Sequence, residues 1–224
     1  MTGNDAPQGV RYGSGDPWPI PAFPLGTVLL PGQLLVLQVF EPRYRVMLFD
    51  LREQHRAQFL VTLIVRGQEV GGGDVRSDVG CLAEVVRSDD QPDGRVLLEV
   101  LGVRPLEVLD WMPEDPYPLA RVREFAPRSR TFEVSDAPER ELAEVMQLDR
   151  GIAEMLTTLG VEVPAATPMP ALLDDLIWQV ALRNPLGTLD RQHLLAEADP
   201  LRRLGAAHEM LAGQLELLRA RGGR

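Results

Sequence analysis

Few residues of this chain have the types and spacing that chemistry requires. All 23 of its basic residues are arginine, and none is lysine. A phosphate-binding loop, a Schiff-base site and a serine–lysine protease each need a lysine, so the sequence excludes all three. None of the serines lies in a Gly-x-Ser-x-Gly motif, which removes the usual anchor of a hydrolase triad. We therefore expect a protein that is not an enzyme.

The single cysteine and the three histidines do not form a metal-binding pattern. Cys81 follows Gly80 in a strand-like segment, and the histidines at His55, His193 and His208 are far apart. Structural zinc sites need clustered cysteine and histidine ligands. We therefore expect no metal and no other cofactor, and we interpret Cys81 as a buried, unreactive thiol. A chain with one cysteine also suits the reducing cytoplasm.

A run of three glycines, together with Phe40 and Arg43, forms the candidate binding set. Gly71, Gly72 and Gly73 are followed by neither a lysine nor a helix, so a loop that rims an apolar groove is a better interpretation than a phosphate cradle. Arg43 belongs to a Glu-Pro-Arg-Tyr motif that we interpret as mainly architectural. Its side chain is open to an ion pair or to a ligand.

The distribution of charge argues against nucleic acid as a partner. The net charge is −10, and acids outnumber arginines in both halves of the chain, by 18 to 12 in residues 1–125 and by 15 to 11 in residues 126–224. A phosphate backbone requires clustered positive charge. No apolar run approaches the ~20 residues of a membrane helix, and the first residues do not resemble a secretion signal. We expect a cytoplasmic protein that binds neither nucleic acid nor a membrane.

Short segments rich in valine and leucine, separated by glycine and proline, are typical of strands. Six are expected, at residues 34–40, 59–65, 79–87, 95–100, 103–111 and 119–125. The Pro92-Asp93-Gly94 sequence has turn chemistry and predicts a hairpin between two of them. Six strands with short links favour a closed or nearly closed barrel, because closure removes unpaired edges.

Apolar residues recur at helical spacing inside this region and throughout the last hundred residues. One helix is expected to begin at Pro42, and its apolar stripe consists of Tyr44, Met47, Leu48 and Leu51. Asp136 and Glu139 have the spacing of a capping box, and the helix after them is expected to end at Gly160. Further helices are expected at about 172–183 and 189–196, and from Asp199-Pro200 onward. The last carries Leu201, Leu204, His208, Leu211, Leu215 and Leu218 as a seam.

The expected organisation follows from these periods. Residues 1–17 are expected to be a disordered leader, residues 18–126 a β-barrel, and residues 127–224 a helical bundle. The fold class is therefore α+β.

The motifs near the start of the barrel resemble the amino-terminal substrate-binding domain of Lon proteases. They are Phe23-Pro24-Leu25, Val28-Leu29-Leu30-Pro31-Gly32 and Val39-Phe40-Glu41-Pro42-Arg43-Tyr44. Weaker matches follow at Val79-Gly80, Asp93-Gly94-Arg95, Gly102 with Arg104, and Tyr117-Pro118. The resemblance extends over residues 18 to 220. It implies a PUA-like β pseudo-barrel followed by a helical bundle.

The resemblance also implies a function. In Lon proteases this module helps to select and hold unfolded or tagged polypeptides, whereas ATP hydrolysis and peptide cleavage belong to later domains that this sequence does not contain. We therefore expect a stand-alone polypeptide-binding module, an adaptor or chaperone-like factor that can work with a separate protease. The apolar faces of the bundle leave homodimerisation open.

Two alternatives remain at this point. A cleft between the barrel and the bundle could hold a small molecule and make the protein a sensor or a weak enzyme, because junctions between domains often hold ligands. Other PUA-like folds suggest RNA binding, but the acidic charge argues against it.

Overall fold

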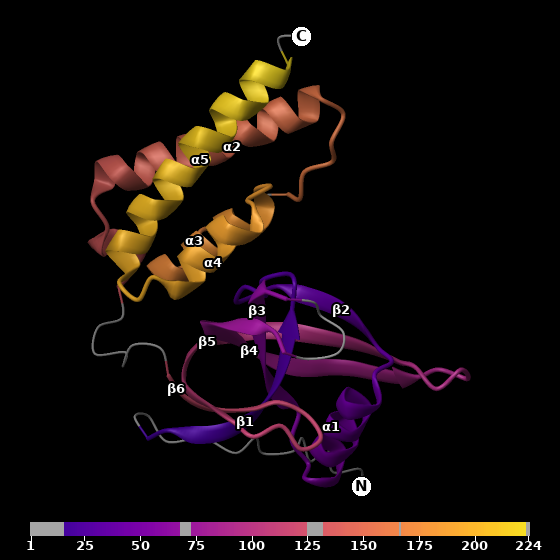
Figure 1. Ribbon diagram of the computed structural model, residues 1–224. Coiled ribbons are helices and arrows are strands. Elements are labelled where there is room, and N and C mark those ends of the chain that lie inside the picture. Colours follow the sequence, from indigo (N-terminus) through magenta and orange to yellow (C-terminus); the bar gives the residue numbers. More distant parts are fainter. Residues whose placement is uncertain (1–15, 68–72, 125–131, 166, 223–224) are drawn as a thin grey trace, which may run out of the picture. The chain divides into compact units, whose positions relative to one another are not determined.

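Two units of different architecture make up the chain: strands and one helix in residues 1–127, and helices in residues 128–224 (Figure 1). The computed structural model describes residues 16–67, 73–124, 132–165 and 167–222. The residues of the expected leader lie almost wholly outside these ranges. A mixed sheet followed by helices confirms the expected α+β fold class.

The first unit is a six-stranded sheet that closes on itself. Its elements are β1 (Trp18–Leu25), β2 (Leu34–Val39), α1 (Pro42–Glu53), β3 (Gln58–Arg66), β4 (Val75–Asp90), β5 (Val96–Met112) and β6 (Leu119–Glu124). The strand order is β2-β5-β4-β3-β1-β6, and β5 also pairs with β6, which closes a pseudo-barrel. Only β1 and β3 run parallel; the other pairs are antiparallel.

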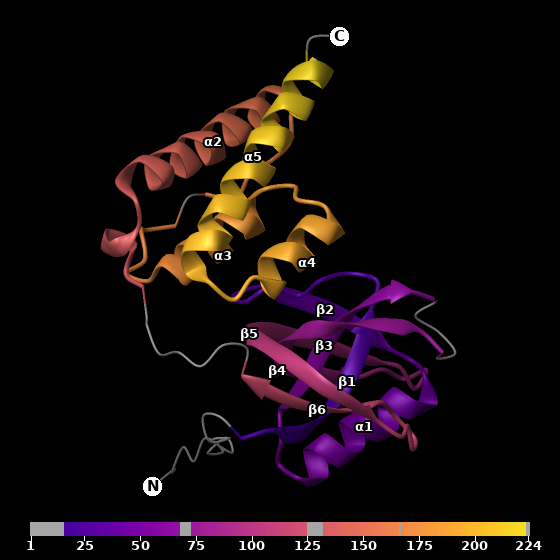
Figure 2. The ribbon, with the colours of Figure 1, turned by 60° about the vertical axis from the view of Figure 1, so that its left-hand side comes forward.

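Both faces of the sheet around β1 and β3 are buried. On one face Ala22 and Leu60 belong to the barrel core. Because successive side chains of a strand point to opposite faces, Phe23 and Phe59 point the other way. There the ring of Phe23 stacks on the ring of Tyr44 of α1, with centroids 4.2 Å apart. The stripe predicted for this helix is buried along its whole length, which seats α1 on the outside of the barrel (Figure 2).

The structure corrects two of the expected strands. Residues 95–100 and 103–111 are not separate strands but one, β5, and Gly102 lies within it. Gly102 is required because a Cβ there would lie 2.1 Å from the carbonyl oxygen of Leu30. Its peptide groups bond to the preceding loop, accepting from Gly32 and donating to Gln33, both at 2.8 Å. This glycine therefore marks a close approach of two backbones rather than a break.

The prediction also missed β1, because its three prolines are untypical of a strand. Pro19, Pro21 and Pro24 lie within this strand, where a missing N–H would normally break a ladder. However, β1 pairs with β6 only through residues 18–21 and with β3 only through residues 22–25. Each half of the strand thus has one unpaired edge, and proline is tolerated at such an edge.

The hairpin turn was predicted correctly. The antiparallel strands β4 and β5 are joined through Gln91, whose N–H donates to the carbonyl of Arg95 at 2.8 Å. Gly94 has a φ of 81°, which only glycine adopts without strain. The strand before this turn is longer than expected and begins at Val75.

The second unit is built from four α-helices and one short 3-10 helix in the part of the chain that the structure describes. They are η1 (Val134–Asp136), α2 (Glu139–Thr158), α3 (Leu173–Arg183), α4 (Thr188–Ala196) and α5 (Pro200–Gly222). Figures 1 and 2 both show α2 and α5 lying side by side. Along the α5 seam Leu204, Leu211, Leu215 and Leu218 are buried. His208 on this seam is one-third exposed, and its Nε2 lies 3.4 Å from a carboxylate oxygen of Glu144.

One of the two expected helix caps is correct. The Asp199 carboxylate accepts hydrogen bonds from the N–H groups of Leu201 and Arg202, so it caps α5 as predicted. The expected pairing of Asp136 with Glu139 is wrong. Asp136 instead accepts from the N–H of Glu133 at 3.0 Å and completes a capping box around η1. The box lies one turn earlier in the chain because the proline at 138 interrupts the two helical segments.

Arg203 holds the ends of three helices of the bundle together. Its side chain is 4% exposed and donates to the carbonyls of Leu194 and Glu197 at the end of α4. It also pairs with Asp174 of α3 and lies over the ring of Trp178, 4.6 Å from the centroid. The guanidinium therefore satisfies the last carbonyls of α4, which a helix end leaves without partners.

Candidate functional site

The strand β2 is the edge of the sheet on one side of the pseudo-barrel. Among the described residues it pairs with β5 alone, from Leu34 opposite Leu101 to Val39 opposite Val96, without a register shift. An unpaired edge presents a row of N–H and C=O groups that another extended chain can bind. Natural proteins usually protect such an edge, so its chemical surroundings decide what it can do.

The hydrogen bonds at the start of β2 show which of its backbone groups are free. The N–H of Gly102 donates to the carbonyl of Gln33, so that carbonyl faces β5. Peptide groups of successive residues alternate between the two edges of a strand. Leu34, Val36 and Gln38 therefore direct their N–H and C=O groups to the edge away from β5.

The outward side chains of this strand are apolar. Leu34 is 64% exposed, Val36 60% and Phe40, which directly follows the strand, 54%. Gln38 lies between them and is also exposed. The alternate residues Leu37 and Val39 are buried in the barrel. A strand that is apolar on its buried face alone would be ordinary; apolar side chains on the exposed face of an edge strand indicate a contact surface.

A hollow of about 180 Å³ opens between this strand and the end of β1. It is lined by Phe23, Pro24, Leu25, Val36, Leu37, Gln38, Val39, Phe40, Glu41 and Tyr44. Most of these side chains are apolar, and Glu41 supplies the acidic group. The wall on the β1 side is also an edge without a strand partner in the described part of the chain. The N–H of Ala22 donates to the carbonyl of Pro118 at 2.9 Å, and Pro24, two residues later on the same edge, has no N–H to offer.

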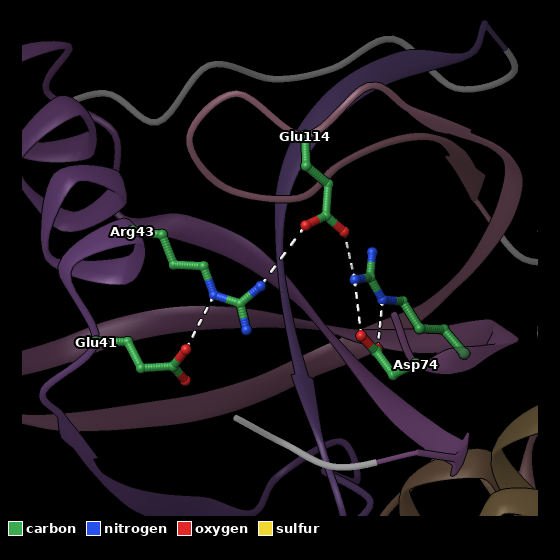
Figure 3. A network of polar contacts seen from close by, with 5 residues as sticks. Glu41, Arg43, Asp74 and Glu114 are labelled. Carbon is green, nitrogen blue, oxygen red and sulfur yellow. Dashed lines mark hydrogen bonds and ion pairs between the residues drawn. The ribbon is translucent and has the colours of Figure 1, made fainter. Parts of the chain in front are cut away.

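A chain of ion pairs fixes the end of the hollow at which α1 begins. Arg43 bonds to Glu41 at 3.1 Å and reaches Glu114, in the loop between β5 and β6, at 3.6 Å (Figure 3). Glu114 also accepts from Arg76 of β4 at 2.5 Å, and Arg76 in turn bonds Asp74 at 2.6 Å. Three segments far apart in the sequence are thus tied together around the start of α1.

Burial makes the inner pair of this network electrostatically strong. The side chains of Asp74 and Arg76 are 3% and 7% exposed. Burial alone would raise the pKa of Asp74, but the hydrogen bonds from Arg76 and from its own backbone N–H, with the charges of Arg76 and Arg43, outweigh it and hold the pKa below its ordinary value. The Arg76 guanidinium also lies over the ring of Trp111, 4.6 Å from the centroid.

Tyr44 contributes its ring rather than its hydroxyl. The ring stacks on Phe23 and lies 4.6 Å from the guanidinium carbon of Arg43. The hydroxyl is buried and has no hydrogen-bond partner within the described residues. Burial and the neighbouring carboxylate of Glu41 raise its pKa to about 12, against the lowering effect of Arg43. It is therefore neutral at physiological pH.

The predicted binding residues fall at different distances from this site. Phe40 lines the hollow and is half exposed, and Arg43 is held in the ion-pair network. Gly73, with a φ of 74°, directly precedes Asp74 of the same network. Gly71 and Gly72 lie outside the described residues. The binding role of these five residues stays a prediction.

Sequence reasoning missed the β2 edge and the ion pairs. Residues 34–40 were predicted as a strand, but their nearly unbroken run of apolar residues is typical of a strand buried on both faces. The proline at position 24 was the available signal, because proline inside a strand indicates an unpaired edge. Asp74 and Arg76 are two residues apart, but nothing local connects them with Glu114, which only the barrel closure brings close.

Other candidate chemistry is weak in the described part of the chain. Cys81 is fully buried, and burial raises its pKa to about 12, which leaves the thiol protonated. No group of three or more histidine, cysteine, aspartate or glutamate side chains within the described ranges could hold a metal ion. No helix in those ranges is long and apolar enough to span a membrane.

Known proteins similar to this chain include Lon proteases. A Lon protease of Roseiflexus castenholzii is 31% identical over 203 residues, and one of Heliobacterium modesticaldum is 25% identical over 200 residues. Each match covers 89% of this chain but 24% of the protease, so the chain spans about a quarter of the length of these relatives.

Solved structures agree with the sequence matches. A Lon N-terminal domain protein from Xanthomonas campestris superposes with a TM-score of 0.63 at 27% identity, covering 84% of this chain and 95% of that one. The N-terminal domain of the Mycobacterium avium complex Lon protease gives 0.62 at 14% identity, covering 87% and 98%, a similarity of fold alone. The model of the ATP-dependent protease La (LON) substrate-binding domain matches residues 19–213. The chain therefore belongs to the LON substrate-binding domain family.

Proposed function

We propose that this protein binds unfolded or extended polypeptides and holds them without cleaving them, as an adaptor or chaperone-like factor that can work beside a separate protease. The observation that carries the proposal is the exposed apolar side of β2, formed by Leu34, Val36 and Phe40 at an unpaired strand edge. The segments that would fit this surface are extended and apolar. A folded client buries segments of this kind and an unfolded client exposes them, so the surface favours unfolded clients.

Two further features support a binding role without catalysis. The chain has no lysine for a serine–lysine dyad or a phosphate-binding loop. Its cysteine is buried and protonated. The single cysteine also supports our proposal that the protein works in the cytoplasm.

The small-molecule alternative is less well supported. Drug-sized ligands occupy pockets of roughly 300–1,000 Å³. The hollow beside β2 is about 180 Å³, which is room for one or two side chains. RNA binding remains disfavoured because the net charge is −10.

Titration with a permanently unfolded protein tests the proposal. Fluorescently labelled α-lactalbumin, reduced and carboxymethylated, is titrated with the purified chain, and anisotropy reports binding. We expect saturable binding that native α-lactalbumin does not compete for, together with slower aggregation of a heat-denatured client. No rise in anisotropy up to about millimolar protein, the weak end of the affinity scale, would refute the proposal.

A further inference from the structure

We propose that the free edge of β2 binds its client by strand addition, and that the preferred client segment is extended, apolar at alternate positions and positively charged. This inference rests on the proposed function and adds the binding mode and the client chemistry. Three observations on the molecule carry it: the direction of the free peptide groups, the side chains beside them, and an unpaired carboxylate.

The peptide groups come first. Leu34, Val36 and Gln38 direct N–H and C=O groups away from β5, and within the described residues β2 pairs with no other strand. An added strand satisfies these groups in a ladder that continues the sheet beyond β2. Because backbone groups are common to all sequences, this ladder supplies affinity for any extended segment.

The side chains beside the edge add a preference. Side chains on one face of an added strand lie next to the exposed Leu34 and Val36. The hollow adjoins the same edge, with Val36 and Phe40 in its lining, and it has room for an apolar side chain. A segment with apolar residues at alternate positions fits this surface best, because only one in two side chains faces it.

Charge determines the third preference. Glu99 of β5 lies directly opposite Val36, so their side chains share the outer face of the sheet. Glu99 is partly buried, and its carboxylate has no ion pair or hydrogen bond within the described structure. Its other cross-strand neighbour, Arg87 of β4, pairs with Asp89 at 2.9 Å instead. A long basic side chain of the client, lying across Val36, can reach this carboxylate. The net charge of −10 also attracts a cationic segment and repels an acidic one.

Two variants at one position separate the backbone contribution from that of the side chain. Val36→Pro removes an N–H that faces the free edge and leaves the β5 ladder intact, whereas Val36→Ala keeps the N–H and loses most of the side chain. We expect Val36→Pro to weaken binding of a labelled peptide of alternating valine and arginine about three- to tenfold more than Val36→Ala does, the value of one hydrogen bond. Phe49→Ser, which removes an exposed apolar side chain from α1, is the control and should have no effect.

Modified peptides test the same point without changing the protein. N-methylation of every valine and N-methylation of every arginine block opposite edges of the peptide strand. We expect one of the two peptides to retain its affinity and the other to lose it. Equal affinity of the two would overturn strand addition, because a contact through side chains alone does not distinguish the edges.

The charge preference has its own control. Replacing arginine by glutamate in the peptide should weaken binding, and Glu99→Gln should reduce affinity for the arginine peptide roughly two- to fivefold, the range of an exposed ion pair. An unchanged affinity would overturn the assignment of Glu99.

If Val36→Pro and wild type bind unfolded α-lactalbumin equally well, strand addition at β2 is wrong and the proposed function stands. If wild type binds no unfolded protein, the proposed function itself fails. Circular dichroism of Val36→Pro checks that the barrel remains folded.

Discussion

Replacing Arg76 by methionine should destabilise the barrel strongly, although Arg76 does not belong to the hydrophobic core. Arg76 neutralises Asp74, whose side chain is 3% exposed, and also bonds Glu114. Methionine leaves the Asp74 carboxylate buried without its partner. Removing one member of a buried pair costs about 3 kcal/mol, mostly as the penalty of the remaining charge. We expect a loss of that size in the free energy of unfolding at neutral pH.

Urea unfolding measured by tryptophan fluorescence is the assay. Trp18 and Trp111 lie in the barrel unit and Trp178 in the helical unit, so a Trp178→Phe background makes the signal report the barrel alone. Adding Asp74→Asn to Arg76→Met should recover more than half of the loss, because the buried charge is then gone. An unchanged urea midpoint for Arg76→Met would refute the reasoning. So would a double variant that is less stable than the single one.

The pH dependence gives an independent check with a definite sign. The folded-state pKa of Asp74 lies below its ordinary value of 3.8. Its pair with Arg76 therefore contributes fully above pH 3.8, and the contribution is lost as pH falls through the lower, folded-state value. The stability difference between wild type and Arg76→Met should be largest near neutral pH and shrink on acidification, first because the unpaired Asp74 carboxylate of the variant takes up a proton and then because the wild-type pair is lost. A difference that grows on acidification would contradict the assigned role.

Three further substitutions test other parts of the molecule. Tyr44→Phe should leave the free energy of unfolding of the barrel, measured in urea, unchanged or raise it by up to about 1 kcal/mol, because the deleted hydroxyl is buried without a partner among the described residues. A clear loss of stability would reveal a hydrogen bond that the hydroxyl makes. Gly102→Ala should cost at least about 2 kcal/mol, measured by thermal denaturation, because its Cβ would lie 2.1 Å from a backbone oxygen of Leu30; a wild-type melting temperature would refute this close approach. Arg203→Lys should destabilise the bundle by about 2 kcal/mol in Trp178 fluorescence, because a lysine cannot bond two carbonyls and a carboxylate at once; full stability would contradict its role.

Local patterns in the sequence were sufficient where structure depends on local chemistry. The stripe through Tyr44 and Leu51 predicted a helix and its buried face, and Gly94 predicted a turn that needs a positive φ. Asp199 before a proline predicted the start of α5. In each case the decisive contacts lie within a few residues, so periodicity and capping rules apply directly.

The same patterns failed where distant segments decide the structure. A glycine such as Gly102 suggests a break in a strand. Here its small size instead allows the backbone of Leu30, about seventy residues earlier in the chain, to come close. The prolines of β1 suggested a loop because their tolerance depends on which neighbours leave an edge unpaired. The pairing of Asp74 with Arg76 is local, but the link to Glu114 exists only after the barrel has closed.

The candidate site follows from the way the barrel closes, because β2 and the second half of β1 each keep one edge without a strand partner among the described residues. In a fully paired barrel, the second half of β1 and the free edge of β2 would have ladder partners, and Pro24 would break one of them. In this barrel both edges border the hollow, and the proline removes a donor that would otherwise bind water or a strand. The donors that remain belong to β2, beside its exposed apolar side chains. At the hollow, the described edge that keeps its N–H donors is that of β2, so the N–H of Val36 is the group with which the proposed strand addition is best tested.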